Sequence, residues 1–251
     1  MITIAIAIHK GGTSKSTTAL NLAYELTRTG RRVLLVDLDY QASLTAMSGL
    51  PDSPGHNITQ VMTGKSTMRT VARPLRPGLS IVPSDIELAD TELTLANKIG
   101  RENILKRALS AVDGFDVAIL DCPPSLSVMT INALAAAAGV LVPLQPTPTD
   151  LRALDLFMTT LDEIERVVNP ALVLLGVILT FFDQRYSLHG DVVKHLDEAG
   201  IPVVAKIGRS VKIAESTGAH LPLSEYDADN PQVTSYHDLS KAVIAWLNDH
   251  N

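Results

Sequence analysis

One short stretch near the start of the sequence, residues 9–17 (HKGGTSKST), combines lysines, glycines and hydroxyl side chains. Glycines allow backbone N–H groups to point at phosphate oxygens, and the N-terminus of a following helix favours anions. Lys15 is placed to reach the outer phosphates of a nucleotide, and Ser16 to give a hydroxyl to Mg²⁺. The stretch predicts a phosphate-binding loop, whose expected binding residues are Lys10, Gly11, Gly12, Thr13, Ser14, Lys15, Ser16 and Thr17.

The loop departs from the strict pattern G-x-x-x-x-G-K-[ST] at both glycine positions, which His9 and Ser14 occupy. A Cβ at the second position costs on the order of 1 kcal/mol if the backbone φ there is positive. Ser14 therefore bears directly on nucleotide affinity or turnover. The alternative interpretation is a glycine-rich turn that only joins a strand to a helix.

Three carboxylates follow apolar runs elsewhere in the chain. Asp37 and Asp39 end the run at 32–38, and Asp121 ends the run at 117–120. Side chains two residues apart on a strand share one face, and the carboxyl ends of parallel strands border the ligand crevice. Mg²⁺ and an attacking water both need hard oxygen partners, so these carboxylates predict a metal region. Ordinary strand-end carboxylates are the alternative.

The elements that must position these groups alternate regularly between strand and helix. Apolar β-branched runs predict strands at 1–8, 32–38, 79–83, 115–120, 140–144, 172–180 and 202–207. Amphipathic or alanine-rich periods predict helices at 15–29, 87–109, 125–137, 150–168, 190–199 and 235–247. Residues 51–78 show no clear period. This alternation predicts an α/β fold, a single domain over 1–251 with a mostly parallel sheet and helices on both faces.

Composition excludes several classes of protein. The net charge of −6 does not indicate a constitutive nucleic-acid binder, although local patches decide such contacts. The single cysteine, Cys122, rules out an internal disulfide or a multi-cysteine metal site. No signal peptide and no apolar stretch of bilayer length are evident. A cytoplasmic protein without a membrane partner is expected.

The motifs together resemble the ParA/MinD family of P-loop ATPases, whose deviant Walker A loop reads K-G-G-x-G-K-[ST]-[ST]. The chain is most similar to small, Soj-like ParA partition ATPases without an N-terminal helix-turn-helix domain. Ser14 and Tyr40 depart from the family pattern, the latter where D-x-D-P-Q has proline. The matching segments are 10–17 (KGGTSKST), 37–43 (DLDYQAS), 117–125 (VAILDCPPS), 125–137 and 207–221.

This resemblance implies ATP or ADP and Mg²⁺ as cofactors, and a weak ATPase activity. It implies that Lys10 reaches across an ATP-bound sandwich dimer to the partner's phosphates, and that Asp39 orients the attacking water. The implied catalytic residues are Lys10, Lys15 and Asp39; the implied metal residues are Ser16, Asp37 and Asp121; and Asp183 lies where the family closes around the base.

The same resemblance implies a partition or positioning function. The ATP-bound homodimer would bind DNA without sequence preference on the nucleoid, and a ParB-like or adaptor protein would stimulate hydrolysis and release. Candidate DNA-binding residues are Arg185, Lys194, Lys206, Arg209 and Lys212, with a merely solvated basic face as the alternative.

Three other functions stay open from the sequence. The same mechanism could position a protein cargo, such as a carboxysome or a chemoreceptor cluster. A P-loop small-molecule ligase is an alternative of another class, against which Lys10 argues. A scaffold that holds ATP and barely hydrolyses it is suggested by Ser14.

Overall fold

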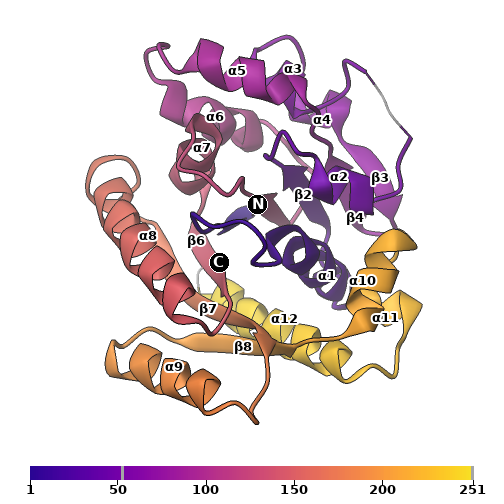
Figure 1. Ribbon diagram of the computed structural model, residues 1–251. Coiled ribbons are helices and arrows are strands. Elements are labelled where there is room, and N and C mark those ends of the chain that lie inside the picture. Colours follow the sequence, from indigo (N-terminus) through magenta and orange to yellow (C-terminus); the bar gives the residue numbers. More distant parts are fainter. Residues whose placement is uncertain (52–53, 250–251) are drawn as a thin grey trace.

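A single eight-stranded sheet organises the part of the chain that the structure, a computed structural model, describes, residues 1–51 and 54–249 (Figure 1). The strand order is β3-β4-β2-β5-β1-β6-β7-β8, with only β3 antiparallel to its neighbour among these strands. The strands are β1 (Ile2–Ile6), β2 (Val33–Asp37), β3 (Arg73–Arg76), β4 (Leu79–Val82), β5 (Val117–Asp121), β6 (Gly139–Leu144), β7 (Val173–Phe182) and β8 (Val203–Gly208).

Helices cover both faces of the sheet, as the alternating pattern predicts (Figure 1). They are α1 (Lys15–Arg28), α2 (Ser43–Met47), α3 (Ile58–Met62), α4 (Met68–Val71), α5 (Glu87–Leu95), the 3₁₀ helix η1 (Arg101–Asn103), α6 (Ile104–Ser110), α7 (Val128–Ala136), α8 (Pro148–Val167), α9 (Ser187–Glu198), α10 (Val211–Gly218), α11 (Leu223–Tyr226) and α12 (Pro231–Asp249). The closing helix, expected over 235–247, begins four residues earlier and extends to Asp249.

Two hydrophobic cores form because successive strand residues point to opposite faces. On one face Leu34 and Val36 of β2 pack in the core that α3 to α9 cover. On the other face Val33 and Leu35 pack with α1, α2, α11 and α12. Both faces are thus buried, which explains why the central strands read as continuous apolar runs rather than alternating ones.

The pairing register brings the ends of three central strands together. In the parallel ladder between β2 and β5, Asp37 lies opposite Asp121. In the ladder between β1 and β5, Ile6 lies opposite Asp121, so the loop that follows β1 begins beside both carboxylates. Three segments that are distant in sequence therefore meet at one edge of the sheet.

The helix predicted over 87–109 is wrong as a single element. The structure divides it into α5, η1 and α6, and Gly100 between them has a φ of 69°. That left-handed backbone is the conformation that commonly ends a helix and that favours glycine. The break turns η1 toward α7, against which it packs.

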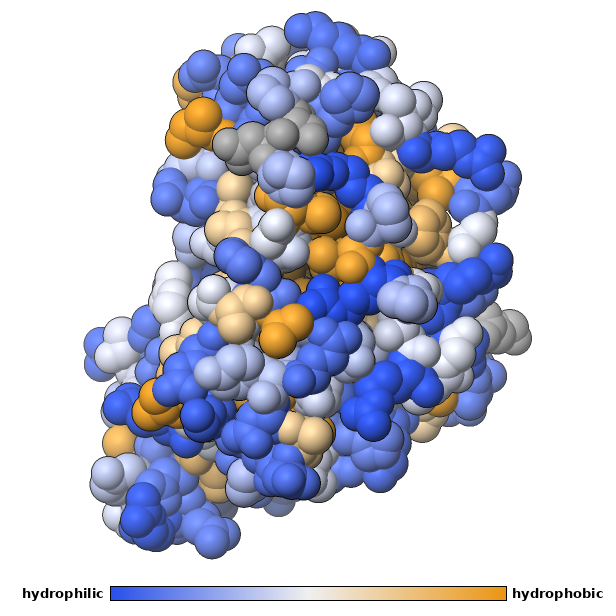
Figure 2. All heavy atoms as spheres, turned by 90° about the vertical axis from the view of Figure 1, so that its right-hand side faces the viewer, coloured by the Kyte–Doolittle hydropathy of each residue, from blue (hydrophilic) through white to orange (hydrophobic). Residues whose placement is uncertain are grey.

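The stretch 51–78, which had no clear period, contains α3, α4 and the edge strand β3. Asn57 and Thr67 cap the two short helices by accepting backbone hydrogen bonds from Gln60 and Thr70. On β3, Pro74 cannot donate to a further strand, a common way of protecting a sheet edge. The side of the molecule toward β3, α10 and α11 is mostly hydrophilic, with apolar residues reaching the surface near its middle (Figure 2).

Within residues 1–51 and 54–249, the structure has no helix whose length and apolar character would let it cross a membrane.

Candidate functional site

The loop of residues 9–14 connects β1 to the first turn of α1. Gly12 has a φ of 74° and Ser14 a φ of 67°, so both adopt the left-handed backbone conformation. Ser14 therefore has the positive φ at which a Cβ costs conformational free energy. Within the described residues, the N–H groups of residues 11–14 donate no hydrogen bond to protein. These groups, and the unpaired N–H groups in the first turn of α1, can donate hydrogen bonds to phosphate oxygens.

Lys15 folds back over this loop. Its Nζ donates to the carbonyl oxygen of Lys10 at 2.7 Å, and the residue is buried. Burial lowers the pKa of the Lys15 ammonium, and the carboxylate of Asp121 acts in the opposite direction. A buried ammonium with a backbone carbonyl as its hydrogen-bond partner is suited to anionic phosphate oxygens.

Lys10 points elsewhere, to the start of α8. Its Nζ lies 2.8 Å from Oδ1 of Asp150, whose side chain is 1% exposed, while the Lys10 side chain is 29% exposed. The hydroxyl of Thr147 donates to the same Asp150 oxygen, and Gln145 Nε2 donates to the carbonyl oxygen of Gly12 at 2.8 Å. The two lysines of the loop therefore occupy different surroundings.

Asp37 is fixed by hydrogen bonds. Its Oδ2 accepts from the backbone N–H of Thr45 at 2.9 Å and from the Thr45 hydroxyl at 2.8 Å, and Oδ1 accepts from the backbone of Asp39 at 3.1 Å. The Thr45 hydroxyl in turn accepts from the backbone N–H of Ser84 at 2.9 Å. Burial raises the pKa of the Asp37 carboxyl to about 6, and the Thr45 hydrogen bonds limit that rise.

Asp121 is buried without a hydrogen-bond partner for either carboxylate oxygen in the described chain. Burial, and next the Asp37 carboxylate, raise its pKa well above the ordinary value, while the Ser16 hydroxyl and Lys15 act in the opposite direction. An unpaired buried carboxylate is costly unless a cation or donor joins it. Ser16, Asp37 and Asp121 thus supply hard oxygens at one place, which fits Mg²⁺.

Asp39 lies just beyond Asp37 and is buried at 8% exposure. Its Oδ1 accepts a hydrogen bond from the backbone N–H of Gln41 at 3.0 Å, which leaves Oδ2 without a hydrogen bond in the described chain. This position leaves a carboxylate oxygen available near the loop, as an oriented water would require.

A small cavity lies beside the loop, and Phe181 and Gly208 line both this cavity and a larger neighbouring hollow. A cavity of about 210 Å³ is lined by Ser14 and Thr17 together with Thr180 and Tyr236. A larger hollow of about 940 Å³ includes Asp183. Phe181 between them has a φ of 53°, a strained conformation for a bulky residue of the kind found at functional sites.

Asp183, expected to contact the base, is not beside the phosphate loop. Its carboxylate forms an ion pair with Arg185 at 2.6 Å, which lowers the pKa of that carboxyl to about 2. It lines the larger hollow, whereas Ser14 and Thr17 line the smaller cavity. Of β7, Thr180 and Phe181 line the smaller cavity with Ser14 and Thr17, and Asp183, which follows β7, does not.

The five basic residues proposed for DNA are all exposed, and three of them line one hollow. Arg185, Lys206 and Arg209 line the larger hollow together, with Lys206 over the Phe182 ring and Arg209 over the Phe181 ring. Three of the five are paired with acids: Arg185 with Asp183 at 2.6 Å, Lys194 with Glu198 at 3.7 Å and Lys212 with Glu215 at 2.8 Å.

Sequence reasoning missed Thr45 as a partner of Asp37 and Asp150 as a partner of Lys10. Thr45 follows Asp37 by eight residues, in a short helix without a visible period. Asp150 follows Thr147-Pro148, and a Thr-Pro pair is a helix-start signal that places an acidic residue in the first turn. That signal identifies the helix start but not the lysine that lies against it.

Comparisons with known proteins agree with this geometry. A family model described as an AAA domain matches residues 1–174. The chain is 35% identical over 248 residues to the chromosome-partitioning ATPase Soj of Treponema pallidum, covering 97% of each. It is 34% identical over 255 residues to the chromosome partitioning protein ParA of Caulobacter vibrioides, covering 98% of this chain and 95% of that one.

A solved structure extends the likeness to three dimensions. Cobyrinic acid a,c-diamide synthase from Mycobacterium smegmatis with bound ADP and magnesium matches with a TM-score of 0.86 and 35% identity, covering 100% of this chain and 97% of that one. The same protein with a bound ATP analog and magnesium matches equally well. The chain therefore shares the fold of this ADP- and magnesium-bound protein along its whole described length.

Proposed function

Because the chain belongs to the ParA/MinD family of P-loop ATPases, we propose that it is a partition ATPase. In this proposal the ATP-bound chain dimerises and binds DNA without sequence preference on the nucleoid. A ParB-like or adaptor partner protein then stimulates hydrolysis and returns the chain to the unbound state. Whether the cargo is DNA or a protein assembly is decided by that partner.

The ligands of the site are ATP or ADP with Mg²⁺, as in the structures that the chain resembles. Bound Mg²⁺ would neutralise charge on the phosphate oxygens. The residues that would hold it are Ser16, Asp37 and Asp121, since Asp121 has two buried oxygens without a partner in the described chain.

Different residues of the chain would bind the phosphate and orient the water during phosphate transfer to water. The free N–H groups of residues 11–14 and the start of α1 bind phosphate oxygens, and Lys15 places its ammonium against them. Asp39 would orient the attacking water through its free carboxylate oxygen.

The observation that carries the proposal is the separate placement of Lys10. Its ammonium lies outside its own phosphate loop, against Asp150 at the start of α8, and it is partly exposed. A lysine held there can reach a second copy's phosphates, where an ammonium stabilises the charge that develops during transfer. Such a contact makes hydrolysis depend on dimerisation.

We place the DNA contact on the three cations that share the larger hollow, Arg185, Lys206 and Arg209, with Lys194 and Lys212 outside it. The acidic total of −6 is compatible with this, because the cations are clustered and dimerisation doubles their number. Phosphate contacts add steeply to affinity and make binding salt-dependent.

A titration of a non-specific DNA duplex tests the proposal, with ATP–Mg²⁺, with ADP–Mg²⁺ and without nucleotide. Binding only with ATP, weakened by added salt and lost in Lys15→Ala, is the expected result. Dimerisation measured under the same conditions should follow the same nucleotide dependence. Absence of DNA binding in every nucleotide state would remove the partition function.

A second candidate is a small-molecule ligase, favoured by the 35% identity to the cobyrinic acid a,c-diamide synthase structure. A ligase would consume ATP in proportion to an amide product made from a carboxylate substrate. Supplying cobyrinic acid, glutamine and ATP separates the functions, since amide formation would support the ligase. Nucleotide-gated DNA binding without product would support partition.

A further inference from the structure

Thr45, a residue of the short helix α2, joins elements that end beside the nucleotide site. Its backbone N–H and its hydroxyl both donate to Oδ2 of Asp37 at the end of β2, at 2.9 Å and 2.8 Å. Its hydroxyl oxygen accepts from the backbone N–H of Ser84, which follows β4, at 2.9 Å. Thr45 therefore connects the ends of β2 and β4 through α2.

The hydroxyl of Thr45 is held in one orientation by its two partners. A threonine hydroxyl carries a single proton and rotates until its hydrogen bonds are made. Because the Ser84 N–H donates to its oxygen, the proton of the hydroxyl is left for Asp37. Ser84 and Asp37 are both buried, so water does not compete for either bond.

The Asp37 carboxylate has little acceptor capacity left. Its two oxygens together offer about four acceptor sites. Oδ2 accepts from both Thr45 donors, and Oδ1 accepts from the backbone N–H of Asp39 at 3.1 Å. Within the described residues, Oδ1 is therefore the Asp37 oxygen that can still accept. Asp121, which lies opposite Asp37 in the ladder between β2 and β5, has both oxygens without a partner there.

The helix α2 has little stability of its own with which to hold Thr45. It spans five residues, Ser43–Met47, of which Leu44 is buried. Ala42 before it has a φ of 52° and caps it with no side-chain hydrogen bond. Helices this short do not persist without tertiary contacts. The bonds between Thr45 and Asp37 therefore fix the carboxylate and the helix against each other.

We propose that Thr45 is a positioning residue of the Mg²⁺ site, whose hydroxyl holds Asp37 so that Oδ1 stays open to the cation. Hydrogen bonds to a carboxylate that serves a metal set its orientation, and their removal commonly costs about 10- to 100-fold in metal affinity. Without the hydroxyl, Oδ2 of Asp37 keeps only the N–H of Thr45, and the carboxylate can turn. The inference rests on the Mg²⁺ site of the proposed function and needs neither dimerisation nor DNA binding.

The test measures how Mg²⁺ changes the affinity of the full chain for a fluorescent ADP derivative, first in EDTA and then at rising Mg²⁺ concentrations. Thr45→Val keeps the branched shape and the backbone N–H but removes the hydroxyl. We expect the Mg²⁺ concentration at half effect to rise about tenfold in this variant. The ADP affinity in EDTA, which depends on the phosphate loop, should stay unchanged. Thr45→Ser restores the hydroxyl and should behave as the unchanged chain does.

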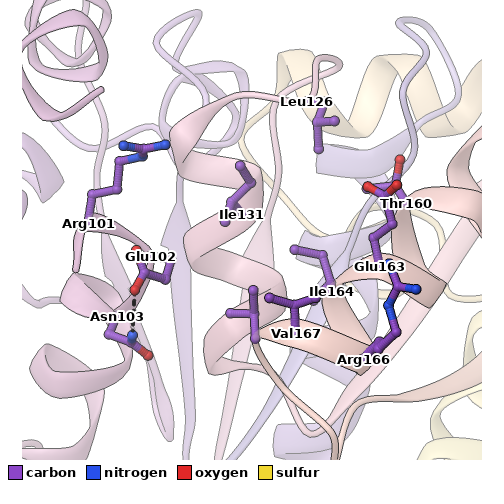
Figure 3. A pocket seen from close by; sticks show the side chains of 11 residues that line it. Arg101, Glu102, Asn103, Leu126, Ile131, Thr160, Glu163, Ile164, Arg166 and Val167 are labelled. Carbon is purple, nitrogen blue, oxygen red and sulfur yellow. Dashed lines mark hydrogen bonds between the residues drawn. The ribbon is translucent and has the colours of Figure 1, made fainter. Parts of the chain in front are cut away.

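Two other threonine-to-valine variants separate positioning from a general loss of stability. The hydroxyl of Thr59, a buried residue, donates to the Asp85 carboxylate at 2.9 Å, so Thr59→Val removes a comparable bond away from the site. Thr160 lies on α8 at a groove between η1, α7 and α8 (Figure 3), and its hydroxyl donates to the Leu156 carbonyl oxygen at 3.3 Å. Neither variant should change the Mg²⁺ dependence. Thermal unfolding without nucleotide should show similar losses for Thr45→Val and Thr59→Val.

Three results would contradict this role of Thr45, and they differ in what else they remove. If the ADP affinity of the unchanged chain does not respond to Mg²⁺, the Mg²⁺ site of the proposed function is wrong and the role of Thr45 falls with it. If Mg²⁺ acts on the unchanged chain and Thr45→Val responds as Thr59→Val does, Thr45 is structural only and the Mg²⁺ site stands. A weaker ADP affinity of Thr45→Val in EDTA would show that the phosphate loop, and not Asp37, depends on the hydroxyl.

Discussion

Ser14 is the residue at which this chain departs most clearly from its family pattern, and its φ of 67° shows what the departure costs. Replacing it by glycine removes a Cβ from a left-handed position, worth about 1 kcal/mol. We expect Ser14→Gly to raise ATP affinity or turnover by up to about fivefold. Nucleotide titration and steady-state phosphate release measure both.

A control separates loop chemistry from general relief of strain. His220 has a φ of 58° and lies outside the phosphate loop, so His220→Gly should change thermal stability without changing turnover. If Ser14→Gly leaves affinity and turnover unchanged, the serine does not limit the site, and the scaffold alternative loses its support.

The ion pair of Lys10 and Asp150 gives a second prediction at this scale. Lys10→Ala leaves the buried Asp150 carboxylate without its cation, which we expect to lower the free energy of unfolding by about 2 kcal/mol, since the partial exposure of Lys10 reduces the cost. Adding Asp150→Asn removes the unpaired charge and should recover most of the loss. Urea unfolding without nucleotide measures both variants against the unchanged chain.

Lys194→Ala is the comparison for an exposed pair. Its ammonium lies 3.7 Å from Glu198 on the surface of α9, and its loss should cost less than about 0.5 kcal/mol. Equal losses for Lys10→Ala and Lys194→Ala would show that Asp150 does not hold Lys10 in solution.

At the scale of elements, the packing of β7 beside the segment that leads into β8 requires a glycine at position 176. Gly176 has a φ of 141°, and a Cβ there would lie 2.5 Å from the carbonyl oxygen of Pro202, which precedes β8. We expect Gly176→Ala to lower the free energy of unfolding by at least about 2 kcal/mol, because strand and backbone must shift. Thermal and urea unfolding test this.

Gly190 is the matched glycine. It lies within α9, and a Cβ there would meet no atom within 4 Å. Gly190→Ala should therefore stabilise the chain by about 0.5–1 kcal/mol through helix propensity. A destabilising Gly190→Ala would contradict this account of α9.

At the scale of the whole molecule, the clustered cations predict a salt dependence. Arg209 is exposed and shares the larger hollow with Arg185 and Lys206. If it contacts DNA phosphate, Arg209→Ala should reduce the slope of log Kobs against log[salt] by about 1.8 for a dimer, about 0.9 for each contact. Arg69→Ala, an exposed cation on α4, should leave the slope unchanged.

Much of this molecule follows from local patterns in the sequence. Apolar runs such as 115–120 predict buried strands, because a strand that is covered on both faces needs apolar side chains on both. The phosphate loop is predicted because glycines, lysines and hydroxyl side chains lie between a strand and a helix. The carboxylates at 37, 39 and 121 are predicted because each lies at the end of such a strand or just after it. These features depend on residues close together in the chain.

Tertiary structure alone decided the contacts between distant residues. The register that sets Asp37 opposite Asp121, the ion pair of Lys10 with Asp150, and the support of Asp37 by Thr45 all depend on which strands and helices become neighbours. The short helices of 51–78 form because buried side chains such as Met62 and Met68 pack in the core, not because of a sequence period. Packing free energy is shared among many residues far apart in sequence, so no local pattern reveals it.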